Sequence, residues 1–366
     1  MTLLSMLIAL IIERLAVRSA RWQLVSYLRP YLHYADKPPF SIITRPQAGL
    51  LLWCLLPALL ITVFMLLVDF WLFSLLVNTL VLLLCMGCWH YRQLYKQYLN
   101  AAARDDQQAA FLAMQQIETD AGISAQQLSY GQRLVWLNFK YYAAVLFWFA
   151  VFGAFGALLY AILRLLAEPA TYISSETENE AVIQSEASAQ TNTTQNFAAD
   201  MAAPEVTQDA TQQSAQADTE ISVTAADIDL AAEGQHEQTT SAAEDLQQLS
   251  ERTQQLSRSL VLQQRLTAVA SDLSHWADWL PARLFGLGFA LVGHFSRASA
   301  ILLSYLGDSS TQACQVLTDI AKAAEPLPEE LLNCSTESCS LVQLSKRNIL
   351  FFLALVAILT LSGALG

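Results

Sequence analysis

Two clusters of ionisable side chains lie where they could bind a ligand or move a proton. Glu13 and Arg14 follow an apolar run of 11 residues. An ionisable group at such a depth is a functional candidate, although adjacent charges at a membrane boundary often only anchor a helix. Arg104, Asp105 and Asp106 form the second cluster, and carboxylates beside an arginine can hold Mg²⁺ or a phosphate. The alternative for this cluster is the solvated face of a helix.

Further polar side chains flank apolar segments later in the chain. Asn138 and Lys140 precede a long apolar run and could line the same mouth as the second cluster. Asp278, Arg283 and His294 form a polar stripe on either side of a short apolar stretch. A buried Asp–Arg pair there is a structural fixture as readily as a functional site.

Most motifs of well-known chemistry are absent from the sequence. It has no G-x-x-x-x-G-K-[ST], no G-x-G-x-x-G after a strand, no G-x-S-x-G and no H-E-x-x-H. The five histidines show no ligand spacing, so we expect no metal site and no cofactor. Cys334 and Cys339 flank a polar tetrapeptide and could form a disulfide if that loop is periplasmic.

The elements that must position these residues are membrane helices. The chain of 366 residues is 54% hydrophobic and 14% charged, with a mean hydropathy of +0.35, which argues against a soluble globular enzyme. A membrane-spanning helix needs about 20 apolar residues. Four uncharged runs are long enough to cross: Gly49–Val68, Phe70–Trp89, Tyr141–Leu163 and Asn348–Gly366.

Lysines and arginines near the membrane predict the orientation of these runs. Basic residues gather in segments 13–45 and 90–133, which we therefore place in the cytoplasm. The third apolar run then leaves the cytoplasm, and the segment that follows it is periplasmic. Lys346 and Arg347 conflict with this scheme, and a further crossing by residues 284–306 would resolve the conflict.

The sequence divides into three regions, at 1–167, 168–245 and 246–366. Residues 168–250 hold 16 acidic and no basic side chains, and we expect the middle region to be a disordered acidic insert. A docking or Ca²⁺-binding loop is the alternative reading of that insert.

Helical patterns are predicted on both sides of the insert. Residues 90–121 are expected to form one cytoplasmic helix, and a second begins at a capping box of Ser124 and Gln127. Leucines at helical spacing predict an amphipathic helix over 246–273, which Pro281 ends. The expected fold class is all-α: a polytopic membrane protein with about four transmembrane helices, cytoplasmic helical extensions and the acidic insert.

Several separated motifs resemble the AmpE family of inner-membrane proteins from the β-lactamase induction operon. They occur in the same order over nearly the whole chain outside the insert: Glu13–Leu15, Trp22–Leu24, Tyr98–Asp106, Trp136–Tyr142, Leu146–Trp148, Asp278–Leu284, Gly307–Asp308 and Gln315–Leu317. The resemblance implies a multi-pass protein of the bacterial inner membrane that modulates or transduces the signal of β-lactam antibiotics. The implied partners are the lipid bilayer and either a cell-wall-derived ligand or another envelope protein, with no nucleic acid.

The same motifs are similar, more distantly, to the CobD/CbiB family of cobalamin biosynthesis. That similarity implies the alternative function, an amide-forming membrane enzyme in which Asp105 and Asp106 bind a metal–nucleotide while Asp278 and Arg283 orient the substrate. This chain has Glu13-Arg14-Leu15 in place of the Gly-Asp-Pro and His-Pro motifs of that family. We therefore favour a non-enzymatic transducer. A transporter ranks last, because the apolar runs show no intramembrane charge and no broken-helix signal.

Overall fold

The computed structural model describes residues 2–15, 24–34, 47–68, 70–86, 89–121, 128–167, 264–325 and 334–363, with the single residues 40 and 261. One compact unit consists of Met1–Tyr172 and Leu262–Gly366. The expected acidic insert lies outside the described residues, as do Ser124 and Gln127 of the expected capping box. All regular structure in the described ranges is helical, as predicted.

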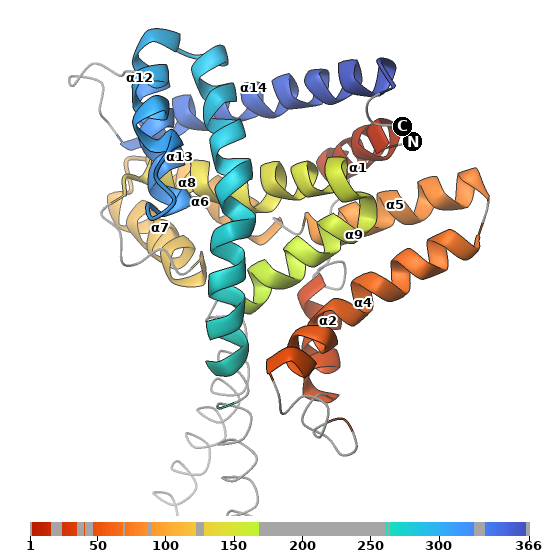
Figure 1. Ribbon diagram of the computed structural model, residues 1–366. Helices are drawn as coiled ribbons and strands as arrows, with labels where there is room; N and C mark the ends of the chain where they lie inside the picture. The colour runs from red at the N-terminus through yellow and green to blue at the C-terminus, as the bar shows by residue number, and fades with distance from the viewer. Residues whose placement is uncertain are drawn as a thin grey trace, which may run out of the picture. The chain divides into compact units, whose positions relative to one another are not determined.

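The first half of this unit contains two long apolar helices and several shorter ones (Figure 1). In chain order they are α1 (Thr2–Leu15), α2 (Leu24–His33), α4 (Gln47–Leu67), α5 (Trp71–Cys85), α6 (Trp89–Ala103), α7 (Gln107–Ala121), α8 (Tyr130–Asn138), the π-helical turn η3 (Phe139–Ala143) and α9 (Ala144–Ala167). The second half contains a helix over 264–292, α12 (Phe295–Leu306), α13 (Ala313–Ala324) and α14 (Cys334–Leu361).

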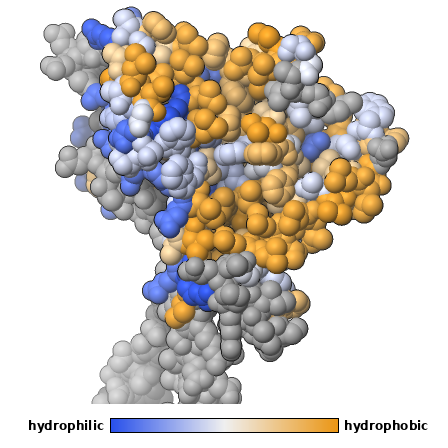
Figure 2. All heavy atoms as spheres, viewed as in Figure 1, coloured by the Kyte–Doolittle hydropathy of each residue, from blue (hydrophilic) through white to orange (hydrophobic). Residues whose placement is uncertain are grey.

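Three stretches in the described chain are long and apolar enough to cross a membrane: Gly49–Leu67, Tyr130–Ala167 and Thr336–Leu361. A fourth exists if α5 and α6 form one bent span. The protein is therefore a helical membrane protein, as its composition predicts. In Figure 2, hydrophobic residues gather on the right of the view, where α4 and α5 lie, and hydrophilic residues gather on the left, over α12 and α13.

The stretch Tyr130–Ala167 folds back on itself at Gly153. This glycine has φ 64° and ψ −148°, a conformation that essentially only glycine adopts. Arg164 donates from Nη1 to the carbonyl oxygen of Lys140 at 2.9 Å, whereas a straight helix would separate these residues by about 36 Å. A Cβ at Gly156 would lie 2.3 Å from the carbonyl oxygen of Trp148, so the turn also needs the second glycine. The expectation of an unbroken third run is thus wrong.

Two prolines lie inside long helices, and a distant aromatic side chain replaces the hydrogen bond that each removes. Proline has no N–H, so the carbonyl four residues earlier loses its helical donor. Pro57 of α4 deprives the Trp53 carbonyl of its helical donor, and this carbonyl accepts instead from the Tyr31 hydroxyl at 2.7 Å. Pro281 deprives the Ala277 carbonyl of its helical donor in the same way, and this carbonyl accepts instead from the Trp148 indole N–H at 3.1 Å. The helix therefore continues through Pro281, where a break was predicted.

Two further predicted elements are interrupted. The helix expected over 90–121 breaks at residues 104–106, and α6 packs against α7 as a hairpin. The crossing considered over 284–306 breaks at Gly293 and His294. A Cβ at Gly293 would lie 2.5 Å from the carbonyl oxygen of Ala324, and the backbone N–H of His294 donates to that same oxygen. These contacts turn the chain into α12.

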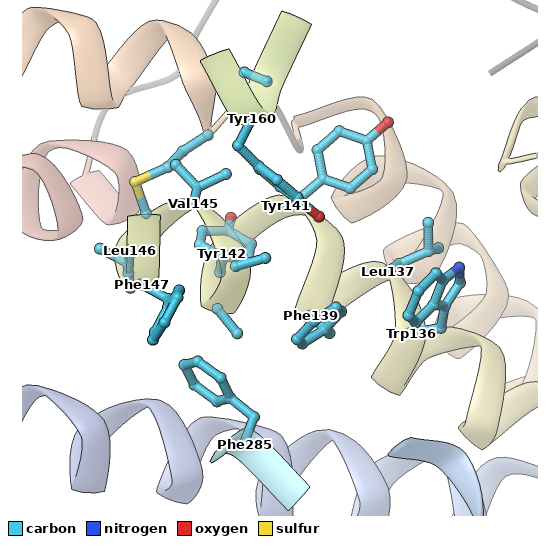
Figure 3. Close-up of a cluster of buried hydrophobic side chains, with 14 of the residues drawn as sticks. Trp136, Leu137, Phe139, Tyr141, Tyr142, Val145, Leu146, Phe147, Tyr160 and Phe285 are labelled. Carbon is cyan, nitrogen blue, oxygen red and sulfur yellow. The ribbon is translucent and has the colours of Figure 1, made fainter. Parts of the chain in front are cut away.

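The core is centred on α8, η3 and the first arm of α9. A capping box of Ser129 and Gln132 starts α8, five residues after the predicted one. Phe139 and Phe285, from η3 and helix 264–292, meet edge to face at 6.1 Å (Figure 3). A Cβ at Gly131 would lie 2.7 Å from the Leu341 side chain, so α8 and α14 pack closely. This core holds the two ends of the folded stretch next to helix 264–292.

Candidate functional site

Polar side chains form a layer at the base of the apolar helices, where α1, α5 and both arms of the folded stretch end. We call this set of residues the polar layer: Glu13, Arg92, Tyr141, Tyr142, Tyr160, Arg164 and Asp278. The carboxylates of Glu13 and Asp278 and the guanidinium of Arg164 are almost fully buried. Burying charge is costly unless it is paired, so each of these groups needs a partner.

Glu13 joins three segments at one end of the polar layer. Its Oε1 accepts from the Tyr142 hydroxyl at 2.9 Å and lies 3.3 Å from Nη1 of Arg92. Arg92 also donates to the backbone carbonyl of Glu13 at 3.1 Å. The Glu13 side chain is 3% exposed and that of Arg92 is 39% exposed, so the ion pair reaches the surface only through the arginine. The other carboxylate oxygen, Oε2, is buried and has no hydrogen-bond partner among the described residues.

Arg164 joins the second arm of α9 to η3 and to α5. It donates to the carbonyl oxygen of Lys140 and, at 3.1 Å, to that of Cys85. Its guanidinium carbon lies 4.0 Å from the centre of the Tyr141 ring, an arrangement that stabilises a desolvated cation. The Tyr141 hydroxyl donates to that of Tyr91 at 3.4 Å. One buried cation thus holds the hairpin closed.

Asp278 lies at the other end of the polar layer, on helix 264–292. Its Oδ1 accepts a hydrogen bond from the Tyr160 hydroxyl at 2.7 Å. Tyr160 lies one helical turn before Arg164 in α9. Burial raises the pKa of Asp278 to about 6, while the charges of Lys140, Arg164 and His275 and the tyrosine hydrogen bond act in the opposite direction. This carboxyl group therefore changes protonation near neutral pH.

The other predicted site residues lie apart from the polar layer. Arg104, Asp105 and Asp106 are exposed in the turn between α6 and α7, where Asp105 has φ 55°. Asp106 accepts from the backbone N–H of Ala109 and so caps α7. Arg14 is exposed at the end of α1. Among the residues that the structure describes, no group of three or more His, Cys, Asp or Glu side chains could hold a metal ion.

Asp278 and Arg283 do not form the ion pair considered from the sequence. Five positions along a helix differ by about 140°, so the two side chains diverge. Arg283 donates to the carbonyl oxygens of Trp279, Tyr305 and Asp308, and so caps the end of α12. The His294 side chain is exposed. The structure thus gives Arg283 a role in packing α12 and keeps it away from the polar layer.

Asn138 lines a separate small cavity of about 10 Å³ at the π-helical turn. Ser345 and Asn348 of α14 are its other polar lining residues, and Phe139, Phe285 and Phe289 supply its aromatic walls. Cys339 of α14 carries a free thiol. The disulfide with Cys334 that was considered from the sequence is therefore not formed.

Sequence reasoning found Glu13 and Asp278 but missed most of their partners. Arg92 and Tyr142 lie 79 and 129 positions from Glu13 in the chain. Arg164 follows an apolar run, where an arginine ordinarily indicates a membrane boundary. Only the fold-back at Gly153 brings the Arg164 side chain into the protein interior. The adjacent tyrosines at 141 and 142 were a usable signal, because paired phenols at the start of an apolar run favour an internal hydrogen-bond role.

Chemically, the polar layer can accept one more hydrogen bond at Oε2 of Glu13 and can exchange a proton at Asp278. Both carboxylates are held by tyrosine hydroxyls, and both belong to elements that meet at α9. A change of charge at either end therefore acts on the segments that form the base of the membrane helices.

The family described as "Regulatory signalling modulator protein AmpE" matches residues 1–185 and 244–366. The chain is similar to "Protein AmpE" of Shigella flexneri, with 25% identity over 380 residues that cover all of both chains. No solved structure matches the chain. Because the family match covers most of the sequence, this membrane protein belongs to the AmpE family of regulatory signalling modulators.

Proposed function

We propose that this protein is a multi-pass protein of the bacterial inner membrane that modulates the response to β-lactam antibiotics, including the induction of β-lactamase. The family membership supports a signalling role. The signal is a cell-wall-derived ligand or a contact with another envelope protein, and the polar layer is the part of the molecule that responds to it.

One observation carries this proposal: Oε2 of Glu13 is buried and finds no hydrogen-bond partner in the part of the chain that the structure describes. A carboxylate accepts about four hydrogen bonds, so an unfilled buried oxygen is a costly feature that a fold retains for a reason. Glu13 holds α6 through Arg92 and η3 through Tyr142. A donor that reaches Oε2 weakens the attraction to Arg92 and so shifts the balance between these segments.

The test is β-lactamase expression before and after a sub-lethal β-lactam, in a deletion strain that carries wild type or a variant. Glu13→Gln keeps the size of the side chain and removes its charge. We expect deletion to alter induction and Glu13→Gln to fail to restore it, at wild-type abundance in the membrane. Asp272→Asn, at an exposed carboxylate of helix 264–292, is the matched control and should restore induction fully.

Two other results would contradict the proposal. Unchanged induction in the deletion strain would show that the protein has no signalling role in the β-lactam response. Full restoration by Glu13→Gln, with failure of the double variant Asp105→Asn/Asp106→Asn, would move the functional site to the exposed turn between α6 and α7.

A further inference from the structure

We infer that helix 264–292 lies in the plane of the membrane, with its exposed apolar face seated in the lipid leaflet on the side that carries α6, α7 and α8. The inference does not depend on the proposed signalling role. It assigns a lipid-binding surface to a helix that is not among the stretches long and apolar enough to span a membrane.

The helix carries a continuous apolar stripe on its outer face. Its members follow one another at intervals of three or four residues and are each between 39% and 63% exposed: Leu273, Trp276, Leu280, Leu284, Leu287 and Leu291. On a helix with 100° per residue these six positions fall within an arc of about 80°, and they extend over about 27 Å. The stripe contains no charged residue. Such a surface is the signature of an amphipathic helix at a membrane interface, and we call it the leucine face.

Contacts outside the leucine face fix the same helix to α9 and α14. Asp278 accepts from Tyr160, and Ala277 accepts from Trp148, both of them residues of α9. Asn348 of α14 donates to the carbonyl oxygen of Phe285 at 2.8 Å. A Cβ at Gly288 would lie 2.0 Å from Oδ1 of Asn348, so the two helices cross in very close contact. The orientation of the leucine face is therefore set by packing.

The crossing point lies where α14 enters its apolar run. Lys346 and Arg347 are exposed and directly precede Asn348, the first residue of 19 without charge. Basic residues followed by an apolar run mark a membrane boundary. Figure 1 shows helix 264–292, in teal and cyan, running across the direction of α4, α5 and α14. A helix that crosses the spans at their boundary lies along the surface of the bilayer.

The leucine face continues into other exposed apolar surface, which favours lipid over a second protein as its occupant. Trp148, which binds Ala277, stacks on Phe152 at 5.7 Å. Phe152 and Val151 are exposed at the tip of the α9 hairpin. The leucine face thus joins surfaces that a bilayer covers on any membrane helix.

The fold-back of α9 makes this arrangement consistent with the distribution of charge. Because Arg164 returns to Lys140, the stretch enters and leaves on one side. Helix 264–292, α12 and α13 then remain on that side, together with Lys346 and Arg347. The basic residues that precede α14 now lie with those of α6–α8, on the cytoplasmic side by the positive-inside rule. This arrangement replaces the periplasmic exit expected from the sequence and needs no extra crossing over 284–306.

Spin labels test the depth of the leucine face. The full chain, with its six cysteines replaced, would carry single labels at Trp276→Cys, Leu280→Cys, Leu284→Cys and Leu287→Cys in vesicles of phosphatidylethanolamine with a minority of phosphatidylglycerol. The ratio of a label's accessibility to oxygen and its accessibility to a water-soluble nickel complex reports the depth of that label in the bilayer. We expect all four labels at one shallow depth, about 5–10 Å into the headgroup and acyl boundary. Leu350→Cys and Ile358→Cys on α14 give a ladder of increasing depth, and Ser271→Cys, on the same helix, should face water.

Three results would overturn the inference. A progressive change of about 16 Å in depth from 276 to 287 would mean that the helix crosses the bilayer. Labels accessible only to the nickel complex would mean that the face meets water. Strong coupling between labels of two copies, with low access to oxygen, would mean that a second copy covers the face.

Sidedness gives a second, independent test. Single cysteines at the exposed positions Gln108 of α7, Ser304 of α12 and Ser362 after α14 are treated with an impermeant maleimide, in intact cells and in inverted vesicles. We expect Gln108→Cys and Ser304→Cys to react from one side and Ser362→Cys from the other. Reaction of Gln108→Cys and Ser304→Cys from opposite sides would contradict the in-plane placement of helix 264–292.

Discussion

Trp148 donates its indole N–H to the carbonyl of Ala277, which Pro281 deprives of its own helical donor. The same arrangement occurs at Pro57, where the Tyr31 hydroxyl binds the carbonyl of Trp53. In an apolar environment an unpaired carbonyl costs several kcal/mol, so a proline inside a membrane helix needs such a replacement. The bond from Trp148 also fixes α9 against helix 264–292, which makes the proline part of the tertiary structure.

The first prediction is that Trp148 and Pro281 are energetically coupled. Trp148→Phe leaves the Ala277 carbonyl unpaired and should destabilise the protein by about 1–3 kcal/mol. Pro281→Ala restores a backbone N–H to the helix, so Trp148→Phe should cost less in that background. A double-mutant cycle of unfolding in detergent measures the difference. Equal costs in both backgrounds would show that the carbonyl does not depend on the indole.

The second prediction concerns Arg164, which closes the α9 hairpin. Arg164→Met leaves the carbonyls of Lys140 and Cys85 without this donor, at about 1–3 kcal/mol for each bond lost. Arg164→Lys should restore only part of the stability, because an ammonium group lacks the planar fork that binds two carbonyls while it stacks on Tyr141. Thermal unfolding in detergent measures both variants. Wild-type stability of Arg164→Lys would contradict the fork geometry.

The apolar runs that became α4, α5 and α14 could be predicted because their signal is local, an uncharged stretch of sufficient length. The fold-back of the third run could not be predicted in this way. Both of its arms are apolar, and glycine is common in membrane helices. The contact that reveals the fold-back joins Arg164 to Lys140, 24 positions apart.

In the candidate site, too, local signals could be predicted from the sequence and long-range contacts could not. Glu13 stood out because it is an ionisable residue after an apolar run. Its partners Arg92 and Tyr142 come from distant segments that only the packing of α1 on α5 and α9 brings together. Pro281 misled the prediction for the same reason, because the residue that lets the helix continue is 129 positions from Ala277.

The third prediction is that Gly153 cannot be replaced without strain. Its φ of 64° and ψ of −148° are closed to side chains with a Cβ, so Gly153→Ala should cost about 1–3 kcal/mol although no atom lies within 4 Å of the added carbon. Gly307→Ala is the matched control, since that glycine also has open space but an ordinary φ of −92°. Thermal unfolding in detergent distinguishes the two. Similar stability of both variants would mean that the hairpin turn tolerates other conformations.

The fourth prediction is a pH dependence that arises from Asp278. Burial raises the pKa of its carboxyl group from 3.8 to about 6. Between these values the folded state keeps a proton that the unfolded state releases. Its contribution to stability is therefore fully present below about pH 4 and is lost as the pH rises through about 6. A shift of two units corresponds to about 3 kcal/mol.

The comparison that isolates this effect is between wild type and Asp278→Asn over pH 4 to 7. The amide keeps an acceptor for the Tyr160 hydroxyl but does not titrate, so the variant should lose the part of the pH dependence that Asp278 causes and become the more stable protein at neutral pH. A difference that stays constant with pH would show that the Asp278 carboxylate remains charged in the fold, held by Lys140 and Arg164 against its burial.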